Sequence, residues 1–90
     1  MDFEWDAAKA TANFKKHGVT FEEASIALRD SLSATARDPD HSIDENRYVT
    51  FGMSSAGRLL AVFHTERGNA IRIISARPVT KLERKIYEES

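Results

Sequence analysis

The sequence has no cysteine, two prolines and four glycines among its 90 residues. Without cysteine the chain has no disulfide bond, no thiolate nucleophile and no thiolate metal ligand. No run of about 18 apolar residues is present, which excludes a membrane-spanning helix of ordinary length. The first residues are acidic and lack the basic and then apolar pattern of a secretory signal. We therefore expect a cytoplasmic protein without membrane contact.

Several catalytic motifs are also missing. The sequence contains no glycine-rich phosphate loop, no GxSxG elbow and no HExxH motif. Its three histidines, His17, His41 and His64, fall in different predicted elements and lack the spacing of metal ligands. We therefore predict no metal site and no cofactor.

The composition predicts one folded domain over residues 1–90. Hydrophobic residues make up 41% of the chain and charged residues 30%, a balance typical of a small globular protein. The net charge of −1 conceals a strong asymmetry: residues 1–45 carry 5 Lys and Arg against 10 Asp and Glu, and residues 46–90 carry 8 against 4. Such asymmetry between halves is a hint of nucleic-acid contact. We expect the second half to present a positive surface.

Two helices are predicted in the first third of the chain. The first begins near a cap at Asp6 and ends at Gly18, which can adopt the left-handed stop conformation. The second opens with a capping box of Thr20 and Glu23 and runs to about Leu28. The apolar stripe of the first helix comprises Phe3, Ala7, Ala10 and Phe14.

The hydrophobic period then changes from that of a helix to that of a strand. Residues 32–36 are a possible edge strand and residues 37–46 a polar loop; the segments 47–53, 58–65 and 70–77 are strands joined by short glycine-containing turns. Pro78 ends the last strand, and a second capping box of Thr80 and Glu83 opens a helix to the C-terminus. The buried stripe of that helix is predicted to be Val79, Leu82 and Ile86. The expected fold class is α+β: two N-terminal helices, a three- to four-stranded antiparallel sheet and a C-terminal helix.

The segment Arg72-Ile73-Ile74-Ser75-Ala76-Arg77 is a buried-strand sequence bracketed by two guanidiniums. Further arginines in this half are Arg47, Arg58, Arg67 and Arg84. Guanidinium forks suit phosphate, and RNA carries its own nucleophile in the 2′-hydroxyl beside each phosphate. Arginines could therefore neutralise the phosphate during cleavage. The alternative is that these arginines are only solvated.

Strand alternation assigns these charges to faces. Arg58 and His64 share one face with Leu60 and Val62. Arg72 shares its side with Ile74 and Ala76, and Arg77 lies on the opposite side in an unbroken strand, although Pro78 can twist it round at the end of the strand. The two arginines therefore need not converge.

Three residues are candidates for general acid or base: His64, Glu45 and Tyr87. Each also has a structural alternative. His64 could be a hydrogen-bonded histidine at the rim of a strand, Glu45 a loop carboxylate paired with Arg47, and Tyr87 a residue that packs the last helix on the sheet.

Two groups of motifs resemble those of the BrnT-type toxins. The first is Phe3-x-Trp5-Asp6-x-x-Lys9 with Asn13-x-x-Lys16-His17-Gly18-Val19; the second is the run at residues 72–77 with Glu83-Arg84-x-x-Tyr87. The resemblance implies a fold similar to RelE-type ribonucleases and an endoribonuclease that halts translation. It also implies a hetero-oligomer with a BrnA-type antitoxin, which alone contacts operator DNA. By this resemblance Arg58, Arg72 and Arg77 handle the RNA.

Two other function classes stay open. One is a non-catalytic interaction module that acts as corepressor with a DNA-binding partner. The other is a small-molecule-binding domain, which would need an apolar pocket that the composition does not indicate. Our leading hypothesis is a ribonuclease toxin that cleaves RNA without metal.

Overall fold

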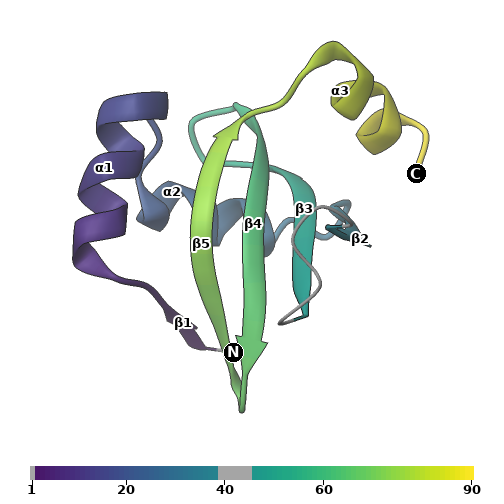
Figure 1. Ribbon diagram of the computed structural model, residues 1–90. Helices are drawn as coiled ribbons and strands as arrows, with labels where there is room; N and C mark the ends of the chain where they lie inside the picture. The colour runs from purple at the N-terminus through teal and green to yellow at the C-terminus, as the bar shows by residue number, and fades with distance from the viewer. Residues whose placement is uncertain (1, 39–45) are drawn as a thin grey trace.

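The computed structural model describes residues 2–38 and 46–90 (Figure 1). Its elements follow in the order β1 (Asp2–Glu4), α1 (Ala7–His17), α2 (Phe21–Leu28), β2 (Ala34–Arg37), β3 (Arg47–Met53), β4 (Leu59–Arg67), β5 (Ala70–Pro78) and α3 (Lys81–Glu88). In these two ranges no helix is long and apolar enough to cross a membrane.

The α+β prediction is confirmed, but the sheet has five strands in the order β1-β5-β4-β3-β2. The meander of β3, β4 and β5 and the edge strand β2 are antiparallel, as predicted. The missed strand is β1, which pairs parallel to β5 with Phe3 beside Ile71. Phe3 is therefore not part of the first helix. A three-residue strand has no periodicity of its own, so only its distant partner reveals it.

The core lies between α2 and the sheet. It consists of Val19, Phe21, Ala24, Ala27, Leu60, Val62, Ile73 and Ala76. Helix α2 lies so close to β3 that a Cβ on Gly52 would come within 2.1 Å of the carbonyl oxygen of Ala27. Only glycine allows this approach.

The helix caps are mostly those that the sequence predicts. Asp6 accepts a hydrogen bond from the amide of Ala8, and Gly18 adopts a φ of 70°. Thr20 caps α2 by accepting the amide of Glu23. The predicted capping box there is only half formed, because the Glu23 carboxylate accepts hydrogen bonds from the side chains of Arg58 and Ser54 instead. The box of Thr80 and Glu83 on α3 is complete.

The buried residue of α1 is polar. Asn13 donates from Nδ2 to the carbonyls of Val19 and Ala76, at 3.0 and 2.9 Å, and its Oδ1 accepts the amide of Ala76 at 3.1 Å. Phe14 of the predicted apolar stripe is exposed, so its expected burial is wrong. Asn13 thus fastens α1 to β5 by mimicking a neighbouring strand.

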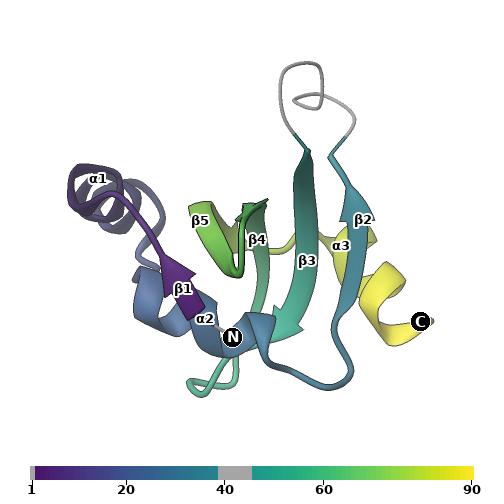
Figure 2. The same cartoon turned by 90° about the horizontal axis from the view of Figure 1, so that it is seen from below.

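Helix α3 faces the opposite way from the prediction. Leu82 and Ile86 are 69% and 45% exposed, so the expected buried stripe is wrong. The inward residues are Glu83 and Tyr87, which form polar contacts with other elements. Figures 1 and 2 place α3 on the β3–β2 side of the sheet, away from α1. Polar anchors, rather than apolar burial, therefore set its orientation.

Candidate functional site

Three arginines share one face of the sheet. Arg47 pairs with Thr65, Thr65 with Arg72, and Ala61 with Arg77. Paired residues on antiparallel strands point to the same face, and Thr65 and Ala61 lie four residues apart on β4. We call this surface, defined by Arg47, Thr65, Arg72, Phe63 and Arg77, the arginine face.

A β-bulge brings Arg77 to this face. His64 pairs with Ile73 and Phe63 with Ser75, so Ile74 is an extra residue in β5. The extra residue reverses the alternation beyond it, which turns Arg77 to the side of Arg72 and Ala76 to the core side. The predicted sharing of a face by Arg72 and Ala76 is therefore wrong. That prediction assumed regular alternation along β5, which the extra residue Ile74 interrupts.

Arg77 is held in place from two sides. Its Nη1 and Nη2 donate to Oε1 and Oε2 of Glu83 at 2.7 and 2.9 Å, and its guanidinium carbon lies 5.4 Å from the centre of the Phe63 ring. The hydrogen bonds from Arg77 lower the pKa of the Glu83 carboxyl, and the same bonds raise the pKa of Arg77. The result is a fixed, flat cation stacked on an aromatic ring.

Arg72 is held only loosely. Its Nη1 lies 3.7 Å from Oε1 of Glu4 on β1, which is an ion pair but too long for a hydrogen bond. Within the described part of the chain its guanidinium makes no hydrogen bond, and the side chain is 28% exposed. None of its five N–H donors is therefore used in a hydrogen bond to a described residue.

Arg47 is the residue of this face that the sequence-based site left out. It lies two strands from Arg72 in the same cross-strand row, which corresponds to roughly 10 Å. The sequence contained the information that places Arg47 on this face: the alternation of β3 and the short turn that sets the register of β3 with β4.

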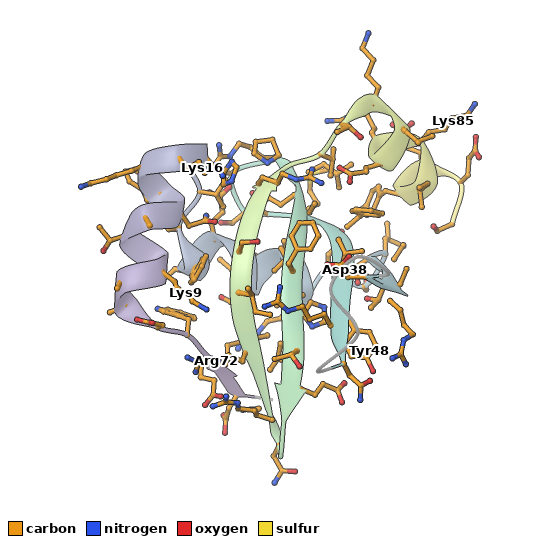
Figure 3. The ribbon with its side chains drawn as sticks, viewed as in Figure 1. Lys9, Lys16, Asp38, Tyr48, Arg72 and Lys85 are labelled. Carbon is orange, nitrogen blue, oxygen red and sulfur yellow. The ribbon has the colours of Figure 1, made fainter. Side chains whose placement is uncertain are left out.

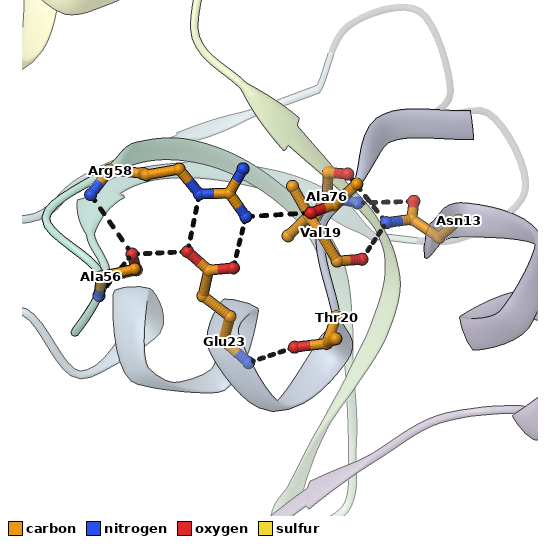
Figure 4. A network of polar contacts seen from close by, with 9 residues as sticks. Asn13, Val19, Thr20, Glu23, Ala56, Arg58 and Ala76 are labelled. Atoms are coloured by element: carbon orange, nitrogen blue, oxygen red, sulfur yellow. Dashed lines mark hydrogen bonds and ion pairs between the residues drawn. The ribbon is translucent and has the colours of Figure 1, made fainter. Parts of the chain in front are cut away.

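Arg58 lies apart from the other two predicted arginines. It donates from Nε and Nη2 to the two oxygens of Glu23 at 3.0 and 2.5 Å, and from Nη2 to the carbonyl of Gly18 at 3.0 Å (Figure 4). The hydrogen bonds from Arg58 lower the pKa of Glu23. These contacts fasten the start of β4 to the N-terminus of α2, so the geometry gives Arg58 a structural part.

His64 shares a face with Leu60 and Val62, as alternation predicted, and in the structure this is the core side, away from the arginine face. It pairs with Tyr48 on the neighbouring strand β3, and the two rings are stacked with their centroids 5.8 Å apart. Its Nε2 lies 2.8 Å from Oγ1 of Thr50, which in turn contacts Thr35 at 2.7 Å. The side chain is buried, and burial lowers its pKa from 6.5 to about 4. The imidazole is therefore neutral at physiological pH.

The two remaining candidates do not join this face in the described structure. Tyr87 donates from its hydroxyl to Oδ2 of Asp30 at 2.6 Å, a bond that raises the pKa of the tyrosine. The same carboxylate oxygen accepts the amide of Met53 at 2.9 Å. Tyr87 thus anchors α3 to the end of β3. Glu45 lies outside the described residues.

Among residues 2–38 and 46–90, no group of three or more His, Asp or Glu side chains is placed to hold a metal ion. The chemistry that this surface offers is that of guanidinium groups beside an aromatic ring. Guanidinium groups bind phosphates, and aromatic rings stack on nucleobases. The fold and this face together describe a small α+β domain suited to an anionic polymer.

Comparison with known proteins gives the family. Residues 5–83 match the family described as ribonuclease toxin, BrnT, of type II toxin-antitoxin systems. The chain therefore belongs to the BrnT family of ribonuclease toxins, as its motifs suggested, and this membership implies an antitoxin partner. The crystal structure of the Brucella abortus ribonuclease toxin BrnT has a similar fold, with a TM-score of 0.71 and 24% identity over 90% of this chain and 99% of that chain. No curated protein matches significantly.

Proposed function

We propose that this toxin cleaves RNA on the arginine face without a metal ion, by attack of the substrate 2′-hydroxyl on the adjacent phosphate. We further propose that the cleavage inhibits translation and that a BrnA-type antitoxin neutralises it. The observation that carries the proposal is the bulge, because it places Arg72 and Arg77 on one face beside Phe63.

In this proposal Arg72 is the main phosphate ligand. Its donors are available, and a guanidinium that meets the phosphate oxygens stabilises the charge that develops as the 2′-oxygen attacks. Arg77 uses three of its five N–H groups on Glu83 and the carbonyl of Pro78, so two remain for the substrate. The pair with Glu83, at 2.7 Å, also offsets its charge more closely than Glu4, at 3.7 Å, offsets that of Arg72. We therefore expect Arg72 to contribute more than Arg77.

The test compares cleavage of an RNA oligonucleotide by the wild type and by Arg72→Ala, Arg72→Lys and Arg84→Ala. Arg84 is an exposed arginine on α3 and serves as the matched control. We expect Arg72→Ala to lower the rate by roughly 100- to 1,000-fold, the usual effect of one charge stabiliser. Arg72→Lys should restore little of the cleavage rate, because the point charge of lysine does not reproduce the bidentate fork of arginine. Arg84→Ala should cleave like the wild type.

The products distinguish the mechanism. As the 2′-oxygen bonds to phosphorus, the bond from phosphorus to the 5′-oxygen of the next nucleotide breaks, and that nucleotide leaves with a 5′-hydroxyl. The other product ends in a 2′,3′-cyclic phosphate, which water opens to a 3′-phosphate, and the reaction continues in EDTA. Products with 3′-hydroxyl ends, or a reaction that stops with chelator, would exclude it. Wild-type activity in Arg72→Ala with an unchanged circular dichroism spectrum would remove Arg72 from the site.

One observation favours a second candidate. Arg58, Arg72 and Arg77 each have a carboxylate neighbour, in Glu23, Glu4 and Glu83. Such pairing suits a non-catalytic module that acts as corepressor with its DNA-binding antitoxin. Expression of the chain alone separates the two: growth arrest relieved by the antitoxin indicates a toxin, and normal growth at confirmed protein levels indicates the module.

A further inference from the structure

A groove runs between α1 and β5, beside the arginine face. It is wide open to solvent, with a volume of about 280 Å³, and the residues that matter here are Lys9, Lys16 and His17 from α1 with Ile74 and Ser75 from β5. Figure 3 shows Lys9 and Lys16 on α1, the helix that lies next to β5. We call this feature the lysine groove.

The helix alone explains only one of the two lysines. Lys16 lies in the last turn of α1, where the helix dipole favours a cation, but Lys9 lies in the first turn, where the dipole disfavours one. The first turn of α1 contains no acidic residue. In the described part of the chain neither lysine forms an ion pair. Their spacing of seven residues keeps both on one side of the helix.

The floor of the groove is the bulge itself. Ile74 is the extra residue of β5, and Ser75 pairs with Phe63 and so lies on the arginine face. The floor therefore lies between Arg72 and Arg77, which are about 16 Å apart along the strand at the usual rise per residue. The acidic groups nearest along the chain are Glu4, which faces Arg72, and the cap Asp6. Both lie at the Lys9 end of the groove.

We propose that the lysine groove binds the RNA backbone next to the scissile phosphate, with Lys9 and Lys16 each neutralising one phosphate. This inference rests on the proposed RNA cleavage and adds a second subsite to it. A cationic groove that follows the backbone beside an aromatic side chain is the usual design for single-stranded nucleic acid. The lysines act by binding only, because the reacting phosphate lies at Arg72.

The test measures binding of a fluorescent 2′-O-methyl RNA oligonucleotide, which lacks the attacking hydroxyl and is not cleaved. The groove variant Lys9→Gln/Lys16→Gln is compared with Lys81→Gln/Lys85→Gln, which removes two exposed lysines from α3. Both variants lose the same charge. Anisotropy titrations over a salt series give the dissociation constant and the slope of its logarithm against the logarithm of salt concentration.

We expect the slope of the groove variant to fall by about 1.4, or 0.7 for each lost phosphate contact, which corresponds to about tenfold weaker binding at 0.15 M salt. The α3 variant should bind like the wild type. In cleavage assays the groove variant should show a raised KM with little change in kcat.

If the wild type cleaves RNA, two outcomes overturn the lysine groove alone. One is a salt slope of the groove variant that equals that of the wild type. The other is an equal loss of RNA affinity in the groove variant and the α3 variant. A wild type that neither binds nor cleaves RNA would overturn the proposed function and the groove together. Thermal melts of both variants establish that the folded protein is being compared.

Discussion

His64 should make the stability of this protein sensitive to acid. Its side chain is buried, and burial lowers its pKa from the usual 6.5 to about 4. Above pH 6.5 the imidazole is neutral in both the folded and the unfolded chain. Below that pH the imidazole is protonated in the unfolded chain but stays neutral in the folded chain down to about pH 4, so unfolding becomes more favourable. The stabilisation is therefore complete above pH 6.5 and is lost as the pH falls through about 4.

The magnitude follows from the two pKa values. Each pH unit between them is worth about 1.4 kcal/mol, so the contribution of His64 should fall by about 2.5 kcal/mol between pH 7.5 and pH 4.5. Carboxylates with lowered pKa values, such as Glu23 and Glu83, also lose stabilisation in acid. Their effect cancels in the difference between the wild type and a His64→Gln variant, which has no imidazole to protonate.

Urea unfolding followed by circular dichroism at several pH values measures this difference. We expect the free energy of unfolding of the wild type, relative to His64→Gln, to fall by about 2.5 kcal/mol across that range. Thr50→Val is the matched control, because it removes the hydrogen-bond partner of His64 but keeps the imidazole. It should lower stability while retaining the acid dependence. A wild-type minus His64→Gln difference that does not change with pH would refute the reasoning.

The same pKa bears on catalysis. A buried histidine that is neutral above about pH 5 and faces away from Arg72 is poorly placed as general base or acid. We therefore expect the pH profile of RNA cleavage to keep both limbs in His64→Gln. Loss of one limb in a variant that is still folded would return His64 to the catalytic site.

Three further predictions concern single contacts, each measured by urea unfolding. Asn13→Ala should cost about 3 kcal/mol, because it leaves the amide and carbonyl of Ala76 and the carbonyl of Val19 without their buried partner; a cost below 1 kcal/mol would contradict this. Gly52→Ala should cost about 3 kcal/mol or more, since its Cβ would overlap the carbonyl of Ala27, whereas Gly57→Asn, in an open turn, should cost little; similar losses would contradict the close approach. Tyr87→Phe should cost about 1 kcal/mol and speed amide exchange in α3, and unchanged exchange would show that the Asp30 contact does not hold the helix.

Much of the local structure followed from the sequence because it depends on neighbours in the chain. Asp6 and Gly18 delimit α1, and Thr80 with Glu83 begins α3, since caps are satisfied within a few residues. The alternating pattern predicted the three strands of the meander and the face that His64 shares with Leu60 and Val62. The motifs at both ends of the chain indicated the family, and the arginine-rich half indicated contact with nucleic acid.

Other features depended on contacts between distant segments. Strand β1 exists because Phe3 pairs beside Ile71, and α3 turns Leu82 outward because Asp30 and Arg77 hold its other side. Neither contact leaves a period in the local sequence. Hydrophobic spacing alone therefore assigned Phe3 to a helix and Leu82 to the core.

The clearest case is the candidate site itself. The sequence determined that two guanidiniums bracket the mostly apolar residues 73–76 within β5, and with an interval of five residues simple alternation puts them on opposite faces. The register with β4 decided otherwise, because the extra residue Ile74 shifts the pairing between Phe63 and His64 and turns Arg77 onto the face of Arg72. A bulge is a mismatch between two strands, so it belongs to neither sequence segment alone. The composition of the site is thus local, whereas its assembly is a property of the sheet.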